Sequence, residues 1–526
     1  MPEYIRSLIL ILIVGGGVFW LARPALIGAL QSAEVYDRDR KIWLSLTCIA
    51  FLAPNFWLYL LIAGLFLYYQ LKRHDNPLAL YLLVFFAAAP LQVIIPGIGP
   101  LDHIIAIDHY RLLALTILIP TAISLYKSTG KAPAGTRSVD ICFALFLIWM
   151  LVVRAGNDSI AGTLRAGFYG LIDNGLPYYV ASRCLNSVTD FRRVLSTFVL
   201  VCVILGVLAA FESARHWLVY DSLRLAWRLP EVMSSYLLRE GGALRANVSV
   251  GNAIVLGYIF ILALAMMNYI RPLLASNWRS RVATICLFAG LISALSRGPW
   301  VGAAAMFLVY LCFGPGMGKR VARLIFGGGA ALIALLVSPW GAKVISYLPF
   351  IGTVETGNVE YRARLFDVSM IVFKQNWLLG DFHYLKNPIM EQMRQGAGII
   401  DMVNTYLQIA LPFGTIGLLL FVGVFVLAMK NVKRVHSQRK DDAEIERLGR
   451  ALIAAMVGLL VTIGTVSSIG AISHFYCILA GICTAYTRTF QRDMAYGRKV
   501  ARATTAKATG ATAPVEASRV KRRGHR

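Results

Sequence analysis

Residues 403–426 read VNTYLQIALPFGTIGLLLFVGVFV, and this stretch decides the fold. A helix needs roughly 20 predominantly apolar residues to cross the hydrocarbon of a bilayer, and this run is long enough. It follows a long polar segment, Gly341–Asp401, whereas nearly all of the remaining chain consists of similar apolar runs joined by short links. The chain is therefore predicted to cross a membrane many times and to carry one sizeable extramembrane loop.

The composition supports a membrane protein rather than a soluble one. Hydrophobic residues make up 58% of the 526 positions, and the mean hydropathy is +0.64. Because lipid offers no partners to backbone polar groups, the spans must be helices. The predicted fold class is all-α, a polytopic integral membrane protein with about 12–14 transmembrane helices. Residues 43–70, kinked at Pro54, and residues 78–97 are each expected to form a single span.

Two regions are expected along the chain. Residues 1–487 form the transmembrane domain, which contains the large loop at 341–403. Residues 488–526 form a basic tail that is rich in alanine, threonine and glycine, and this composition is typical of disordered segments. The tail is expected to be cytoplasmic and to contact anionic lipid.

The formal net charge of +25 would suit a nucleic-acid partner, but its distribution indicates membrane topology. Basic residues cluster in links between apolar runs, such as Lys127–Arg137 and Lys430–Arg450, and in the tail. This is the positive-inside pattern, so these links and both termini are predicted to be cytoplasmic. In a bacterial inner membrane, Glu212–Val250, the turn at Arg297 and the large loop would then face the periplasm. No nucleic-acid partner is expected.

Arginines on the predicted outer side are unusual and therefore informative. Arg297 lies in a tight turn between two apolar runs, Arg245 precedes the run 250–270, and Arg362 and Arg364 lie in the large loop. Each could simply cap a helix end or extend to lipid headgroups. Several on one face favour an anion site instead, because a guanidinium binds phosphate oxygens in a fork and stays charged. A pyrophosphate at the membrane surface suggests a lipid-tethered substrate, whose leaving group fixed arginines would stabilise.

Transfer from such a donor also needs a general base for the attacking hydroxyl. Asp381, His383 and Asp401 are the candidates, and the sequence does not rank them. No pair of residues near these arginines has the spacing of metal ligands, so neither a metal nor another cofactor is expected.

Two polar residues inside predicted spans have other interpretations. Asp173 is expected to neutralise a nearby arginine, such as Arg165 or Arg183. His474 is expected to be a hydrogen-bonded packing residue. A proton relay through either residue would instead suit a transporter.

A set of short motifs shares one order and one membrane context. They are Leu171–Arg183 (LIDNGLPYYVASR), Leu244–Asn252 (LRANVSVGN), Ser296–Gly302 (SRGPWVG), Tyr361–Arg364 (YRAR), Trp377–Gly380 (WLLG), Val403–Gln408 (VNTYLQ) and Gly414–Gly417 (GTIG). Together they resemble the O-antigen ligase and Wzy-type polymerase superfamily, including its exopolysaccharide branch, over roughly residues 140–430.

The resemblance implies a metal-independent, inverting glycosyltransferase that uses an undecaprenyl-pyrophosphate-linked glycan donor at the periplasmic face. It implies that Arg245 and Arg297 contact the pyrophosphate of the donor. Arg362 or Arg364 would close over it, and Asn404 would lie at the start of the helix beneath the loop. By the same resemblance, the partners are the donor, a glycan acceptor and membrane lipid, with a chain-length regulator and a flippase.

Further residues complete the candidate site. Tyr384, Asp401 and Arg165 are expected to bind substrate together with Arg364 and Asn404. Lipid A-core ligases tend to have a histidine before this asparagine, whereas this chain has Val403. His383 would have to substitute for it from within the loop.

The missing histidine favours a polymerase of lipid-linked repeat units over a ligase to lipid A-core or to protein. A flippase for lipid-linked oligosaccharides is the alternative from another class. A flippase would line a cavity at mid-membrane depth with charges, whereas here the charges gather at one face.

Overall fold

The computed structural model describes residues 1–28, 30–97, 103–128, 134–229, 242–314, 318, 322, 326–327, 356–395, 398–439 and 441–508. Six of the described helices are long and apolar enough to cross a membrane, namely Glu3–Leu26, His109–Lys127, Thr136–Ala155, Val188–Arg215, Ala253–Leu273 and Thr405–Gln438. Phe56–Leu71 and Arg297–Cys312 are shorter apolar helices. The described chain is thus a mostly helical protein that crosses a membrane several times, as predicted.

The helices and strands are, in chain order, α1 Glu3–Leu26, α2 Ala33–Leu52, α3 Phe56–Leu71, α4 Pro77–Val84, β1 Val93–Pro96, β2 His103–Ile107, α5 His109–Leu113, α6 Ile119–Ser128, α7 Ala134–Ala155, α8 Ile160–Tyr169, α9 Leu176–Cys184, α10 Val188–Arg215, α11 Ser222–Ala226, α12 Ala253–Ile270, α13 Asn277–Ser293, α14 Arg297–Cys312, α17 Thr356–Gln375, α18 Pro388–Glu391, α19 Thr405–Gln438, α20 Ala443–Ile463 and α21 Ile472–Ala508. Two π-helical segments, Ala114–Leu118 and Gly170–Gly175, interrupt the chain between α5 and α6 and between α8 and α9.

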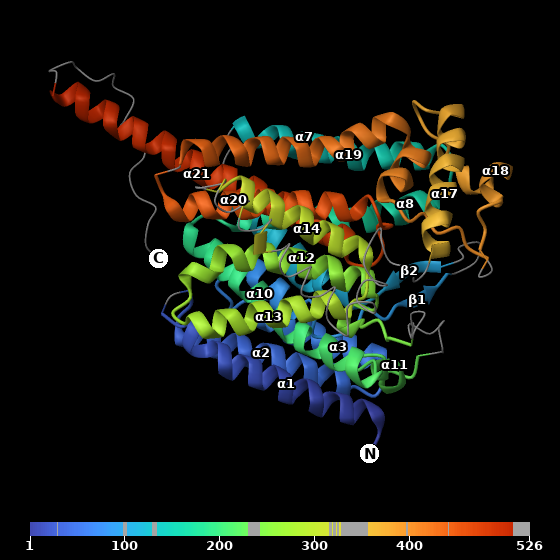
Figure 1. The fold of residues 1–526 in the computed structure, drawn as a ribbon, viewed down its shortest axis with the longest axis horizontal. Coiled ribbons are helices and arrows are strands. Elements are labelled where there is room, and N and C mark those ends of the chain that lie inside the picture. The colour runs from blue at the N-terminus through green and yellow to red at the C-terminus, as the bar shows by residue number, and fades with distance from the viewer. Residues whose placement is uncertain are drawn as a thin grey trace.

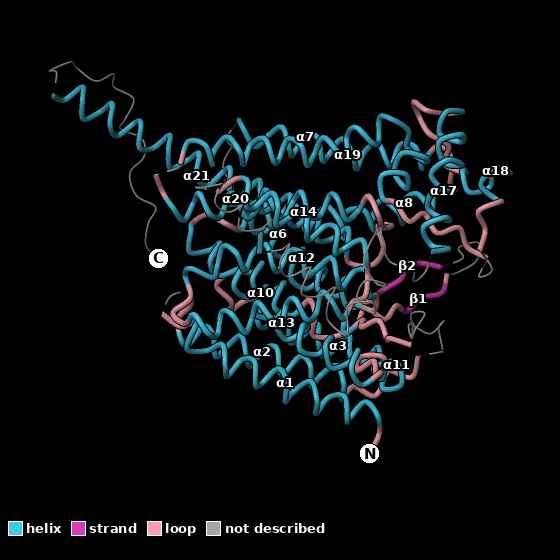
Figure 2. Tube along the Cα trace, viewed as in Figure 1, coloured by secondary structure: helices cyan, strands magenta, loops and turns pink. Residues whose placement is uncertain are grey.

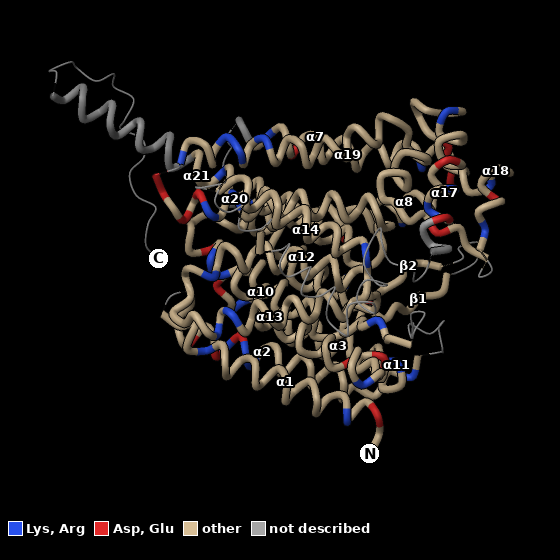
Figure 3. The backbone as a smooth tube through the Cα atoms, viewed as in Figure 1, with Lys and Arg blue, Asp and Glu red and all other residues tan. Residues whose placement is uncertain are grey.

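The long helices lie side by side in one bundle (Figure 1). We call the end that carries the start of α1, the β1–β2 hairpin, α11 and α17 the loop end, and the end toward which α21 extends the tail end. Figure 2 shows the two strands and most of the irregular chain at the loop end. Figure 3 shows lysine, arginine, aspartate and glutamate concentrated near the two ends, with few in the middle of the bundle. This distribution is the one that lipid around the middle requires.

The centre of the bundle is formed by α10 and α12. Both helices are apolar on all sides and almost wholly buried among their neighbours. By contrast, α1 and α7 leave many apolar side chains exposed, including Ile13, Trp20 and Ile148. Exposed apolar side chains on a long apolar helix are those that face lipid.

The prediction of one span over residues 43–70 is wrong, because the chain reverses at Pro54. Proline has no backbone N–H to donate within a helix, and the side chain of Asn55 caps the next helix by accepting from Leu58 N at 2.8 Å. Arg38, near the start of α2, bonds to the carbonyl oxygen of Arg73, which follows α3, at 2.9 Å. Helices α2 and α3 therefore form an antiparallel hairpin.

This hairpin changes the expected position of the N-terminus. At the start of α1, Glu3 accepts a hydrogen bond from the Trp217 indole, which follows α10 at the loop end, at 2.9 Å. The chain beyond Tyr486 leaves at the tail end instead (Figure 1). The first turn of α1 and the chain beyond Tyr486 therefore lie at opposite ends of the bundle. The prediction that they lie on one side of the membrane is wrong.

The expected span 78–97 is also wrong. Helix α4 ends at Val84, and the chain then continues to strand β1, which pairs with β2 in antiparallel register, Val93 opposite Ile107. Pro90 cannot donate within a helix, and the β-branched residues that follow favour an extended chain. The described residues are therefore mostly helical, with this small hairpin at the loop end and an isolated bridge between Ile27 and Gln31.

The predicted start of the tail at residue 488 lies within a continuous helix. Helix α21 continues from Ile472 to Ala508, and Arg488 donates to the carbonyl oxygens of Arg183 and Leu185 at 3.0 and 3.2 Å. Arg488 thus belongs to the bundle, and residues 509–526 lie outside the described residues.

The large loop has a small core of its own. Residues 341–355 lie outside the described residues, and α17 and α18 form the part that follows. Its buried apolar residues are Leu365, Val372, Tyr384, Met390, Met393, Met402, Leu407 and Leu411, the last two from α19. Helix α17 runs across the loop end rather than along the bundle (Figure 1). We refer to residues 356–395, which comprise α17, α18 and the chain that directly follows α18, as the loop unit.

Candidate functional site

The two arginines singled out near span ends are carried by segments that contact each other. The backbone N–H of Ala246, next to Arg245, donates to the carbonyl oxygen of Ser293 at 3.0 Å. Ser293 ends α13, and the turn that follows leads to Arg297 at the start of α14. The structure therefore brings the Arg245 and Arg297 segments together at the loop end.

A buried glutamate, Glu212, holds the Arg245 segment in place. Its carboxylate accepts the backbone N–H groups of Val219, Asn247 and Val248 at 2.9, 3.0 and 2.9 Å. Val248 has a left-handed backbone, with φ of 46°, which a β-branched residue rarely adopts. Sequence reasoning missed Glu212. Its signal was a lone carboxylate at the end of the apolar run 194–212, where an unpaired charge is costly.

Helix α14, which Arg297 opens, is packed tightly against α20 and the turn that follows it. A Cβ atom on Gly298 would collide with the hydroxyl of Thr465, and one on Gly302 would collide with that of Thr462. Glycine is required at both positions because the two backbones approach so closely. Arg297 is thereby fixed beside the turn 464–471, which joins α20 to α21.

The same turn also holds the segment 401–408, which contains two of the predicted site residues. Asp401 accepts the hydroxyl of Ser467 at 2.9 Å, and Gln408 accepts the backbone N–H of Ser468 at 2.8 Å. The Asn404 side chain caps α19 by accepting from Tyr406 N at 2.9 Å. Its oxygen is therefore used in capping the N-terminus of the helix, which is a structural role. Asp401 is the candidate base that the structure places on the turn.

The loop unit contains a polar cleft of about 250 Å³. It is lined by Glu360, Tyr361, Arg364, Gln392, Met393, Arg394 and Gln395. The Tyr361 hydroxyl donates to the carbonyl oxygen of Asp401 at 3.1 Å, and this bond joins the cleft wall to the segment 401–408. Burial raises the pKa of the Tyr361 phenol, which stays protonated as a donor. Carboxamides, a phenol and guanidinium groups are the donors and acceptors that bind polyhydroxylated ligands.

Two arginines differ in their roles at this cleft. Arg394 binds both oxygens of Glu391, each at 2.7 Å, and its guanidinium lowers the pKa of that carboxyl group. Arg364 and Arg362 are both exposed on α17, and Arg364 lines the cleft. The cleft thus presents one arginine already paired and another on its opposite wall.

Asp381 and His383 are held at another place. Asp381 accepts the backbone N–H of His383 at 2.8 Å, and its own N–H donates to Leu411 of α19. Phe382, between them, lies under the guanidinium of Arg154 from α7, 5.4 Å from ring centroid to Cζ. Tyr384 is buried in the core of the loop unit, and burial raises its pKa to about 12. These residues lie beside α7 and the bend of α19, whereas the Arg297 segment lies beside the α20–α21 turn and the Arg245 segment beside the end of α13.

Asp173 pairs with an arginine as expected, but neither Arg165 nor Arg183 is that arginine. Asp173 pairs with Arg111 at 2.8 Å, whereas Arg165 donates to the carbonyl oxygen of His103 and Arg183 pairs with Asp140 at 3.1 Å. Sequence reasoning did not single out Arg111, which follows directly on the β1–β2 hairpin. The available signal was Asp173 itself, since a charge inside a span needs a partner.

The Arg111–Asp173 pair lies in a mostly buried environment. The guanidinium of Arg111 also stacks over the Tyr169 ring, 3.8 Å from the centroid, and donates to the carbonyl oxygen of Ala106 at 2.6 Å. His474 is buried with its Nε2 at 3.9 Å from Asp173, and neither ring nitrogen makes a hydrogen bond. His474 is thus a packing residue as expected, but the expected hydrogen bond is wrong.

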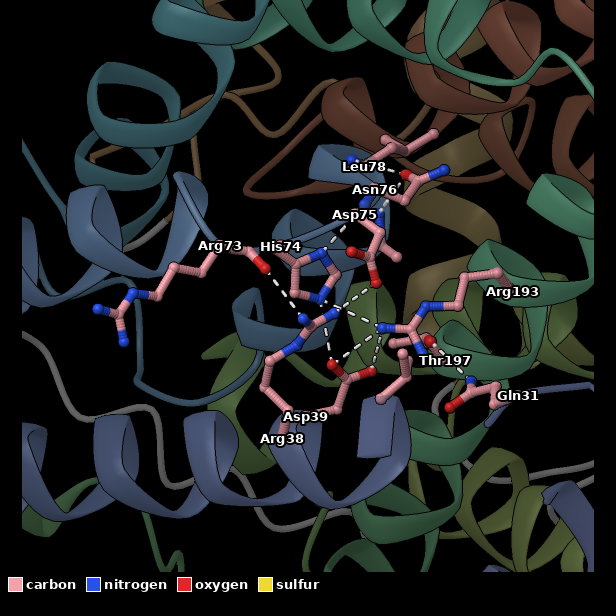
Figure 4. A network of polar contacts seen from close by, with 12 residues as sticks. Gln31, Arg38, Asp39, Arg73, His74, Asp75, Asn76, Leu78, Arg193 and Thr197 are labelled. Atoms are coloured by element: carbon pink, nitrogen blue, oxygen red, sulfur yellow. Dashed lines mark hydrogen bonds and ion pairs between the residues drawn. The ribbon is translucent and has the colours of Figure 1, made fainter. Parts of the chain in front are cut away.

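A second polar network lies at the opposite end of the bundle (Figure 4). Asp39 of α2 pairs with Arg193 of α10 at 2.8 Å and with His74 Nε2 at 3.1 Å. His74 Nδ1 lies 3.3 Å from the N–H of Asn76, which can only donate. Nε2 lies between Asp39 Oδ1 and the guanidinium of Arg193, whose Nη2 is 3.3 Å away. The network ties α2, α10 and the α3–α4 turn together, and it contains none of the predicted site residues.

Within the described parts of the chain, no three His, Cys, Asp or Glu side chains come together in a way that could hold a metal ion. No protein-family model matches the sequence, and no curated protein matches it.

Proposed function

We propose that this chain is a membrane glycosyltransferase of the O-antigen ligase and polymerase type. It would polymerise undecaprenyl-pyrophosphate-linked oligosaccharide repeat units at the periplasmic face of a bacterial inner membrane. The observation that supports this proposal is the convergence at the loop end. The Arg245 segment contacts the end of α13, which leads to the Arg297 turn, and the Arg297 turn and residues 401–408 both contact the turn 464–471.

The reaction requires one bond to form and one to break. An acceptor hydroxyl oxygen attacks the anomeric carbon of the donor, its proton passes to a carboxylate, and the bond to the pyrophosphate breaks with inversion. The lipid pyrophosphate leaves with the electron pair, and its growing negative charge needs fixed cations. We assign that role to Arg245 and Arg297, with Arg362 as the loop arginine, and the proton to Asp401.

The polar cleft of the loop unit is the part that suits a glycan. Arg364 and Tyr361 line it, and the hydrogen bond from Tyr361 to Asp401 joins it to the proposed base. A saccharide in this cleft would therefore lie next to the segment that opens α19. Donor, acceptor and membrane lipid would be the direct partners, and a chain-length regulator and a flippase would act with the enzyme.

The flippase alternative has one observation in its favour. The mostly buried Arg111–Asp173 pair is the kind of intramembrane charge that marks the pathways of transporters. We favour the enzyme because two of the arginines lie together at one end of the bundle beside a sizeable polar cleft.

The test is a glycan profile of cells that lack this protein, complemented with wild type, Arg297→Ala or Arg215→Ala at matched membrane levels. Arg215 is an exposed arginine at the same end and serves as the control. We expect wild type and Arg215→Ala to restore long polymer. In the deletion and Arg297→Ala strains, we expect single lipid-linked repeat units to accumulate outside. Long polymer retained on its lipid carrier would indicate a ligase, and repeat units held on the cytoplasmic face would indicate a flippase.

A further inference from the structure

A short segment of the loop returns into the depth of the bundle. Residues 377–381, after α17, lie against α19 where its backbone is broken at Gly414, which has φ of 64°. The carbonyl oxygen of Trp377 accepts both the N–H and the hydroxyl of Thr415, each at 2.8 Å, and the N–H of Asp381 donates to Leu411 at 2.8 Å. We call residues 377–381 the re-entrant step.

The break in α19 and the re-entrant step satisfy each other's backbone hydrogen-bonding groups. Pro412 and Gly414 interrupt the regular helix, which leaves the carbonyl of Leu411 and the N–H of Thr415 available. The step supplies a partner for each of them. The carbonyl oxygen of Phe413 is bound by the Trp149 indole of α7 at 2.9 Å. Irregular backbone at membrane depth is tolerated when its polar groups are satisfied in this way.

The depth of the step follows from the sequence of α19. Ile409–Met429 contains no charged residue, and it runs from Gln408 to Lys430. At about 1.5 Å per residue this run spans about 30 Å, the thickness of the hydrocarbon layer. Gly414 therefore lies about 8 Å inside the layer on the loop side. The backbone contacts place the re-entrant step at that same depth.

The first three side chains of the step are apolar and face outward. Trp377, Leu378 and Leu379 are 56, 46 and 55% exposed. Three consecutive exposed large apolar residues would be unfavourable in water. At this depth the same side chains would contact lipid chains instead of water, so their exposure would not be unfavourable. A tryptophan near the boundary is typical of interfacial anchors.

We propose that Trp377–Leu379 lie in the hydrocarbon of the surrounding bilayer and that lipid chains are the partner of this surface. The step then holds the loop unit against the membrane. Two further apolar residues, Phe366 and Ile371 of α17, are also exposed. This inference does not depend on the proposed enzymatic function.

The test uses single spin labels on the full chain in vesicles of phosphatidylcholine and phosphatidylglycerol. Cys312 is the exposed cysteine among the eight and would be replaced by serine, with this background as the labelling blank. Labels are placed at Trp377→Cys and Leu379→Cys. Control labels at Lys374→Cys and Lys386→Cys occupy exposed positions of the same loop unit. Relaxation by oxygen, which partitions into hydrocarbon, is compared with relaxation by a water-soluble nickel chelate.

We expect oxygen to dominate at positions 377 and 379 and the nickel chelate to dominate at 374 and 386. Equal nickel access at Leu379→Cys and Lys386→Cys would overturn the proposal. Dipolar broadening between labels of two copies would also overturn it, because a second copy would then cover the surface. As a second measurement, Leu378→Lys should lower the thermal stability of the vesicle-bound protein, whereas Leu378→Met should not. Equal stability of the two variants would contradict a lipid environment.

Discussion

The carboxylate of Glu212 accepts the backbone N–H of Val248 at 2.9 Å and so joins the end of α10 to the segment that carries Arg245. Glu212 binds two further backbone N–H groups, so both of its oxygens act only as acceptors. A glutamine at this position would place an NH₂ group against at least one of these donors.

We therefore expect Glu212→Gln to reduce glycan extension while leaving the protein in the membrane. Hydrogen bonds to a charged group contribute about 1.5–3 kcal/mol, so a loss of about 2 kcal/mol in unfolding free energy is expected. Thermal unfolding and polymer length are the two measurements. Asp221→Asn, an exposed acid nearby, is the matched control. A fully active Glu212→Gln protein would mean that the Arg245 segment does not need this anchor.

Arg297→Lys tests how the pyrophosphate is bound. A lysine ammonium keeps the charge but cannot bind two phosphate oxygens in a fork, so we expect most of the activity to be lost. Polymer length at matched protein levels measures the effect. If Arg297→Lys supports polymer as long as wild type does, the bidentate role is wrong. Chelators should leave the activity intact, and a loss that added divalent cation restores would contradict a metal-independent reaction.

Gly414→Ala should strongly destabilise the protein. Its positive φ is unfavourable for any residue with a Cβ, by about 1–2 kcal/mol, and the added atom would collide with the carbonyl oxygen of Leu378. Gly17→Ala is the control, because nothing lies within 4 Å of its Cβ position. The comparison of melting temperatures in detergent is the measurement. Similar melting temperatures for the two variants would show that the re-entrant step is not held tightly.

The Arg111–Asp173 pair should contribute far more than an exposed pair does. Removing one partner of a buried pair costs about 3–5 kcal/mol, since the other charge remains without compensation. We expect Asp173→Asn to lower the unfolding free energy by about 3 kcal/mol. Asp158→Asn, which breaks the more exposed pair with Arg154, should cost less than about 1 kcal/mol. Equal losses in chemical unfolding would show that the first pair is well solvated.

Asp108 should make the stability depend on pH. Burial raises the pKa of this carboxyl group from 3.8 to about 6. The folded protein therefore binds a proton more tightly than the unfolded chain, and stability falls as the pH rises from about 4 to 6. Asp108→Asn keeps an acceptor for the N–H of Arg111 and cannot ionise. Its melting temperature should therefore stay constant over this window. If wild type and variant give parallel profiles, Asp108 does not titrate with a raised pKa.

Apolar run length was sufficient to predict the membrane class and most of the helices. It failed at Pro54 and Pro90, because hydropathy records only whether residues are apolar, and both breaks lie within apolar sequence. A proline followed by an asparagine that can cap a helix was the local signal for the α2–α3 hairpin.

The site could be predicted only in part for a different reason. Span ends correctly placed Arg245 and Arg297 on one face, since topology determines which ends share a side. The partners of Asp173 could not be predicted, because Arg111 lies far away in sequence and only the packing of α5 against the π-helical segment brings it near. Asn404 looked like a functional residue, yet its oxygen caps a helix, a role that the same residue type serves elsewhere in the chain.

The α2–α3 hairpin has a consequence for how the chain enters the membrane during synthesis. It places the first turn of α1 at the loop end, beside Trp217. If the more basic tail end stays in the cytoplasm, as the positive-inside rule states, the leading end of α1 is the one exported across the bilayer. The first turn of α1 and the tail end would then lie on opposite sides of the bilayer. A reporter enzyme joined ahead of α1 would be active in the same compartment as the polar cleft.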